Sequence, residues 1–290
     1  MHEAQDSSIR DQNTKGGQRQ FSRLRWSLIG LFGVVVLLLR YSADPFLGTI
    51  QSIVFTILLF VLAILHGVER YGAKNLTVFF FVTWVVSLFF EALSIRTGFP
   101  FGSYHYAMLL VVSVFGVPLT VIFAYFAAGY FSWMLSHVLT GRYSAKLNGK
   151  WVVIVPFIAA YTMVMWDLGM DPLFSSVLKQ WLWQSPGPYF GVPIMNYVGW
   201  FLVVFIFYQL YALFLSKYDR IDSQKMNTLT GKSYWTEAAV VYAFIGLSTI
   251  VAAISRTNDI TVSTALVTVF TMIFVAIISL IAIMNNEALT

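Results

Sequence analysis

Long apolar runs recur along this chain, and they constrain its fold more than any other feature. Crossing the hydrocarbon core of a bilayer as a helix takes about 20 apolar residues. Runs of about that length lie at roughly 24–41, 50–66, 76–95, 117–139, 151–170, 196–216, 236–255 and 262–284. Hydrophobic residues make up 58% of the 290 and charged residues 11%, far from the averages of soluble domains. The sequence therefore predicts an all-α, polytopic integral membrane helix bundle with about eight transmembrane helices.

Lysine and arginine are distributed unevenly between the connections. If the N-terminus is inside, the outer segments contain four of the 18 basic residues, and the other 14 lie on the inner side. Cytoplasmic connections of membrane proteins carry such an excess. We therefore expect both termini in the cytoplasm of a multi-pass protein of the cell membrane. The net charge of +5 then needs no nucleic acid as a partner.

The chain divides into one long apolar domain and two tails. Residues 1–22 are polar and basic, a composition typical of a disordered tail. Residues 23–285 form a single transmembrane domain, and residues 286–290 form a short C-terminal tail. The first apolar run lacks a convincing signal-peptide cleavage site, which favours a retained anchor. The chain has no cysteine, which excludes disulfides and thiolate chemistry.

The two long outer connections, 96–116 and 171–195, are rich in glycine, proline and aromatic residues. Pro172 predicts that the fifth transmembrane helix ends at about that point. A helical apolar spacing in the second connection predicts a short helix along the membrane interface. Its members are Phe174, Val177, Leu178, Trp181 and Leu182.

Four acidic residues lie near membrane depth, at the outer ends of predicted helices: Glu91, Asp167, Asp171 and Asp259. Ionisable residues are costly in a membrane and mark functional sites by default, so one cavity is expected to collect them. Asp167 and Asp171 are four residues apart and share a helix face. Two structural alternatives stay open: Asp171 lies at the water line, or Glu91 forms an ion pair with Arg96.

Other polar groups accompany these acids. His105, between Tyr104 and Tyr106, is the one histidine of four near the acids, and Asn196 either caps the sixth helix or positions water or a carboxylate. The histidines show no metal-ligand spacing, and hydrolase, P-loop and dinucleotide motifs are absent. We therefore predict neither a metal nor an organic cofactor.

Three segments together resemble one protein family. They read E-x(4)-R-T-G-F-P-F-G-S-Y-H-Y at 91–106, W-D-x-x-x-D-P at 166–172 and Y-F-G-V-P-x-x-N-Y-x-G-W at 189–200. They are similar to the membrane-integral carotenoid biosynthesis proteins of the CruF type, carotenoid 1,2-hydratases that include bisanhydrobacterioruberin hydratase of halophilic archaea. The similarity covers roughly residues 50–285. It implies addition of water across the terminal C1=C2 bond of an acyclic carotenoid ψ-end, which gives a tertiary alcohol.

This reaction needs a proton donor, a stabilised tertiary cation and a positioned water. Burial among apolar groups favours the neutral form of a carboxyl group, so we expect Asp167, beside Trp166 and Met170, to be the acid. Asp171, nearer water, is the expected base, and Glu91 is the competing acid. An aromatic face stabilises a desolvated cation by about 2 kcal/mol. The expected substrate-binding residues are Arg96, Phe99, Phe101, Tyr104, His105, Trp166, Asn196, Tyr197 and Trp200.

Two other functions fit parts of the sequence. A non-enzymatic carotenoid- or lipid-binding membrane protein needs the apolar cavity without the acids. A prenyltransferase-like enzyme binds diphosphate through magnesium on an aspartate pair, yet the sequence lacks the second acidic cluster that such enzymes need. The expected partners are an acyclic carotenoid and the lipid bilayer, with other carotenoid-biosynthesis enzymes as further candidates. The carbon number of the carotenoid, and whether one or both ends react, stay open.

Overall fold

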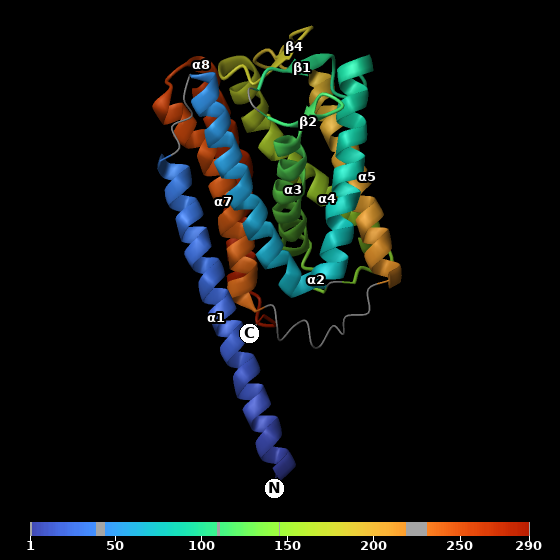
Figure 1. Ribbon diagram of the computed structural model, residues 1–290, viewed down its shortest axis with the longest axis vertical. Helices are drawn as coiled ribbons and strands as arrows, with labels where there is room; N and C mark the ends of the chain where they lie inside the picture. The colour runs from blue at the N-terminus through green and yellow to red at the C-terminus, as the bar shows by residue number, and fades with distance from the viewer. Residues whose placement is uncertain (1, 39–43, 109–110, 145, 219–230, 290) are drawn as a thin grey trace.

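A computed structural model describes residues 2–38, 44–108, 111–144, 146–218 and 231–289. In these ranges, seven helices are long and apolar enough to cross a membrane, so the predicted all-α polytopic membrane bundle is confirmed (Figure 1). The first six are α1 (His2–Leu38), α2 (Pro45–Thr97), α3 (Leu119–Leu139), α4 (Trp151–Asp171), α5 (Ile194–Tyr218) and α7 (Lys232–Ser255). The seventh consists of α8 (Asp259–Thr268), a π-helical stretch η2 (Val269–Ile273) and α9 (Phe274–Met284).

Helix α2 contains two of the eight predicted spans. Its backbone leaves the helical conformation at Gly72, where φ is 68° and ψ is 164°. A positive φ strains most residues but not glycine. The chain reverses there, and Figure 1 shows the two halves of α2 as the arms of a V. We call residues 45–71 the first arm and residues 73–97 the second arm. Counting each arm as one crossing gives the eight crossings expected from the apolar runs.

The N-terminal part of α1 covers residues 2–22, for which a disordered tail stays a prediction. The structure begins this helix at His2 and so continues it through the segment expected to be a disordered tail, which projects beyond the bundle in Figure 1. Helix propagation adds one hydrogen bond for each residue fixed, and no proline interrupts residues 2–38. The inner part of the helix is anchored by Arg25, which forms ion pairs with Glu69 of α2 and Glu237 of α7.

The two long connections, 96–116 and 171–195, contribute strands to a cap over one end of the bundle. Strand β1 (Tyr104–Tyr106) pairs antiparallel with β4 (Trp181–Trp183), with His105 opposite Leu182. A small hairpin, β2 (Ser113–Val114) and β3 (Val117–Pro118), lies nearby. Figure 1 places β1 and β4 at the end of the bundle opposite both chain ends.

The structure bears out one sequence prediction in this region and contradicts another. Helix α4 ends at Asp171, directly before Pro172 as predicted, and a π-helical stretch η1 (Pro172–Val177) follows it. Pro172 has no N–H to donate to the Leu168 carbonyl four residues earlier, and that carbonyl accepts a hydrogen bond from the Tyr189 hydroxyl at 3.1 Å instead. The interfacial helix expected over residues 174–182 is not formed in the described residues 171–195. Residues 174–177 belong to η1, and residues 181–182 belong to strand β4, which pairs with β1 in the cap.

Helix α3 is the central helix of the bundle. Every residue from Tyr125 to Val138 is buried, as expected for a helix that is apolar on all sides and surrounded by others. Its first turns, by contrast, are partly exposed. The cap end of α3 therefore borders both the interior and the surface of the protein.

Candidate functional site

A cavity of about 100 Å³ lies beneath the cap. A single water molecule needs roughly 10–15 Å³ by this measure, so the space holds several waters or the end of an apolar chain. Its walls come from both arms of α2, from α3, α4, α5 and α7, and from the cap. Segments far apart in the sequence thus meet at this one end of the bundle.

Three of the four acids expected near membrane depth line this cavity. Glu91 and Asp171 are each 2% exposed, and Asp167 is 0% exposed. The fourth, Asp259, is exposed at the start of α8. Buried carboxyl groups need hydrogen-bond donors or protonation to be tolerated, so the bonds of each acid indicate its chemical state.

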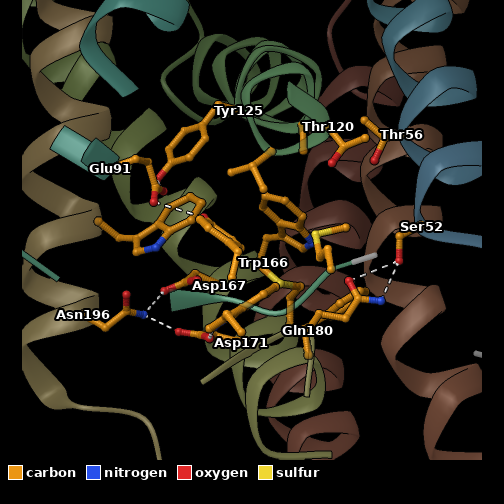
Figure 2. Close-up of a pocket in the computed structure, with 18 of the residues that line it drawn as sticks. Ser52, Thr56, Glu91, Thr120, Tyr125, Trp166, Asp167, Asp171, Gln180 and Asn196 are labelled. Carbon is orange, nitrogen blue, oxygen red and sulfur yellow. Dashed lines mark hydrogen bonds between the residues drawn. The ribbon is translucent and has the colours of Figure 1, made fainter. Parts of the chain in front are cut away.

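The two aspartates share one amide but are bonded unequally. The Asn196 side-chain nitrogen donates to Asp167 Oδ2 at 3.0 Å and to Asp171 Oδ2 at 2.5 Å (Figure 2). Asp171 Oδ1 also accepts from the indole N–H of Trp181 at 2.7 Å. The other oxygen of Asp167, Oδ1, is buried and has no hydrogen-bond partner among the described residues. Two donors favour a carboxylate at Asp171, whereas Asp167 has one oxygen free for a proton.

Glu91 is held by three tyrosines. Tyr125 donates to its Oε1 at 2.7 Å, Tyr106 donates to Oε2 at 3.0 Å, and Tyr104 also donates to Oε2. Burial and the adjacent Glu91 carboxyl raise the pKa of the Tyr104 and Tyr106 phenols well above their ordinary value. Both phenols therefore keep their protons and act as donors to a Glu91 carboxylate.

The alternative ion pair between Glu91 and Arg96 is not formed in the described structure. Arg96 is exposed, and its guanidinium lies 5.8 Å from the centre of the Phe115 ring. The second arm of α2 turns Glu91 towards the cavity, where its hydrogen-bond partners are the three tyrosines and not Arg96. The three tyrosines are neutral donors, so they can stabilise a carboxylate at Glu91 without cancelling its charge.

Aromatic rings form one wall of the cavity. Trp200 stacks on Tyr125 with ring centres 4.5 Å apart, and Trp166 meets Trp200 edge-on at 6.1 Å. Phe101, which is 1% exposed, packs against the same indole at 6.3 Å. Such faces carry negative quadrupole density and attract cations. The carboxyl groups and the aromatic wall thus face one enclosed space.

Some residues predicted for the site lie outside the cavity, within the part of the chain that the structure describes. Phe99 is 51% exposed. Tyr197 is half-buried against Tyr189 and does not line the cavity. Side chains alternate along a strand, so β1 turns Tyr104 and Tyr106 inward and leaves His105 exposed. The predicted residues that do line it are Glu91, Phe101, Tyr104, Trp166, Asp167, Asp171, Asn196 and Trp200.

A second group of lining residues was not predicted from the sequence. Tyr106 stands in a segment already singled out, but Tyr125 lies in an apolar helix and gave no signal. Gln180 of the cap donates to Ser52 of the first arm at 3.1 Å, a contact across 128 positions that sequence spacing does not reveal. Neutral hydroxyl groups complete this side of the cavity: Thr56, Thr120, Ser248 and Thr249.

The fold and the cavity define a class of protein: a polytopic membrane protein with an internal polar site enclosed by apolar helices. Within the residues that the structure describes, no three histidine, cysteine or acidic side chains are grouped as metal ligands are. The family model described as carotenoid biosynthesis protein matches residues 48–285. The chain therefore belongs to the carotenoid biosynthesis protein family, and the resemblance seen in the sequence is confirmed.

A relative with a named activity is bisanhydrobacterioruberin hydratase of Haloarcula japonica. It is 30% identical to this chain over 117 residues, which is 39% of this chain and 36% of the relative. The match thus spans about a third of the length of that relative. No solved structure matches the chain.

Proposed function

We propose that this protein is a carotenoid hydratase, which adds water across the terminal C1=C2 bond of an acyclic carotenoid to give a tertiary alcohol. Membership in the carotenoid biosynthesis family supports a carotenoid substrate, and the name of the Haloarcula relative supports hydration. The observation that carries the proposal is the unequal pair of aspartates on Asn196. One is free to hold a proton and the other is bonded as a carboxylate, as general acid–base catalysis requires.

Asp167 is the proposed proton donor. Its Oδ2 is held by Asn196, while Oδ1 has no partner among the described residues that would retain a proton. In the first step the Oδ1 proton moves to C2 of the alkene, the π electrons form the new C–H bond, and Asp167 becomes a carboxylate. The positive charge then resides on C1, which is tertiary.

The cation is stabilised by the aromatic wall and by Glu91. Trp166 and Trp200 line the cavity, and a desolvated cation over one aromatic face gains about 2 kcal/mol. The Glu91 carboxylate, fixed by three tyrosines, adds a negative charge that needs no rearrangement during the reaction. This assigns Glu91 to electrostatic stabilisation rather than to proton donation.

Asp171 is the proposed base. A water oxygen forms the C1–O bond, and the proton that it loses passes to Asp171. Transfer of that proton back to Asp167 restores the starting state, since the substrate has gained one proton and one hydroxide in total. The shared Asn196 amide keeps the two carboxyl groups in a fixed relation throughout the cycle.

The orientation in the membrane is also a proposal. The end of the bundle that carries both termini in Figure 1 includes the Gly72 turn of α2, the end of α5 and the start of α7. These segments contain the basic residues Arg70, Lys217 and Lys232. The positive-inside rule therefore favours a cytoplasmic location for that end and an extracytoplasmic location for the cavity.

Expression in a host that accumulates an acyclic carotenoid tests the proposed function. We expect a new pigment that is more polar and heavier by one water, detected by chromatography with mass spectrometry. Co-purification of unchanged pigment with the protein, without any hydrated product, would instead favour a carotenoid-binding protein. If the protein neither binds nor converts lycopene or other acyclic carotenoids, both functions are refuted.

A further inference from the structure

We infer that the cavity opens sideways into the bilayer, through a slot between the two arms of α2, and that a linear polyene enters there end first. The substrate class rests on the proposed function, whereas the slot itself rests on geometry. The consequence for specificity is that the protein recognises one end group of the polyene and leaves the rest of the chain in the lipid.

The first observation concerns the exposed turns of α3. Thr120, Val121 and Ala124 line the cavity and are also partly exposed, whereas the helix is buried from Tyr125 to Val138. The carboxyl groups that line the same cavity are only 0–2% exposed. The exposure of Thr120, Val121 and Ala124 therefore does not come from the cavity space alone. The cavity therefore reaches the surface at the start of α3.

The second observation concerns what fills the space between the two arms. Phe60 of the first arm packs against Phe80 of the second arm with ring centres 6.0 Å apart, and against Phe123 of α3 at 5.0 Å. These rings close the V on the side towards Gly72. Thr56 lies four residues, about 6 Å along the helix, nearer the cap than Phe60, and it lines the cavity. At the level where the cavity begins, the short side chain of Thr56 thus takes the place of the aromatic rings that fill the space between the arms.

The mouth of this slot lies between two helix arms that face lipid. Ile57 on the first arm, which does not line the cavity, is 54% exposed, and Val85 on the second arm is 60% exposed. Apolar side chains with that exposure on a membrane-spanning helix are suited to contact with acyl chains. A polyene dissolved in the bilayer reaches this mouth without crossing water. A charged or polar ligand does not dissolve in the bilayer and so does not reach the mouth by this route.

The slot and the acids lie on opposite sides of the cavity. Figure 2 shows Thr56 and Thr120 on one side and Glu91, Asp167 and Asn196 on the other. A chain that enters past the threonines therefore brings its terminal carbons to the carboxyl groups. Pockets that enclose a whole drug-sized ligand measure roughly 300–1,000 Å³, so a cavity of about 100 Å³ accepts an end group and not a complete carotenoid.

Paired tryptophan variants test the slot by turnover. Thr56→Trp fills the slot, and Ile57→Trp adds the same bulk to the adjacent, lipid-facing position. We expect conversion of lycopene to fall by about tenfold or more in Thr56→Trp, since blocked access prevents productive positioning, and to stay near the unaltered level in Ile57→Trp. Ala124→Trp is a second blocking variant. Full conversion by Thr56→Trp and Ala124→Trp, each as well folded as the control, overturns the inference.

A binding measurement separates the slot from the proposed reaction. Because the chain has no cysteine, Ala124→Cys supplies a single thiol at the slot, and Ile57→Cys supplies one outside it. We expect lycopene to slow maleimide labelling of the first variant in detergent and not of the second. Protection without any hydration refutes the proposed function and keeps the slot. Hydration with equal labelling at both positions, and with Thr56→Trp unimpaired, keeps the function and refutes the slot.

Discussion

The asparagine variants of the two aspartates should differ in stability as well as in activity. Asp167 accepts one hydrogen bond, at Oδ2 from Asn196, and its Oδ1 has no partner among the described residues. In Asp167→Asn the new carbonyl oxygen takes the place of Oδ2 and the amide nitrogen takes the free position. The Asn196 bond is kept, so we expect the free energy of unfolding to change by less than about 1 kcal/mol.

In Asp171→Asn, no orientation of the new amide keeps every hydrogen bond of the original carboxyl group. Trp181 donates to one oxygen of Asp171 and Asn196 donates to the other, whereas an asparagine offers one accepting oxygen. One donor must then face an N–H group in a buried site. Loss of a buried hydrogen bond with an unsatisfied partner costs about 1–3 kcal/mol. Asp171→Asn should therefore melt at a clearly lower temperature than Asp167→Asn, although both changes remove one carboxyl group.

Activity should be lost in both variants for different reasons. General acid–base catalysis contributes about 10²–10⁴-fold, which corresponds to roughly 3–5 kcal/mol of activation free energy. We expect Asp167→Asn to lose that factor while keeping its melting temperature, as measured by thermal denaturation in detergent and by chromatography of pigment. Conversion by Asp167→Asn at the unaltered rate would refute its role as the acid. Equal melting temperatures of the two variants would refute the hydrogen-bond assignment.

Three further predictions test other parts of the site. Glu91→Gln keeps the shape but removes the negative charge, so hydration of lycopene should fall by about 10²-fold; full activity would exclude an electrostatic role. His105→Ala should leave conversion within about twofold, because this side chain is exposed on β1, and a large loss would show that the cap rearranges around the substrate. Reporter fusions at Lys146 and Lys179 should locate to opposite sides of the membrane, with Lys146 cytoplasmic; two cytoplasmic signals would overturn the proposed orientation.

The sequence predicted the helices well because the bilayer leaves the backbone few alternatives. Within hydrocarbon every backbone polar group must be bonded internally, so a long apolar run forms a helix. The depth of a residue can then be read from its place in the run. That is why Glu91, Asp167, Asp171 and Asn196 were correctly expected at one end of the bundle, although they come from three different helices.

The rotation of each helix and the structure of the cap could not be read in the same way. Tyr125 reaches Glu91 because of how α3 turns beside α2, and no local pattern encodes that angle. The apolar spacing around Trp181 suits a helix or a strand, and pairing with β1, about 75 residues earlier in the chain, selects the strand. That pairing also turns His105 outward. Because the strand β4 was predicted as a helix, His105 was wrongly expected to line the cavity.

The proposed reaction brings together an apolar substrate and water, and the two sides of the cavity suit different reactants. The slot between the α2 arms faces lipid, whereas the half-buried Trp181 of the cap lines the cavity and bonds to Asp171. On α4, Asp171 is one turn nearer the cap than Asp167. A base at the cap side and an acid one turn deeper fit water arriving through the cap and an alkene arriving from the bilayer. Separate routes would keep the apolar wall dry until the end group is in place, which favours protonation of the alkene over proton loss to water.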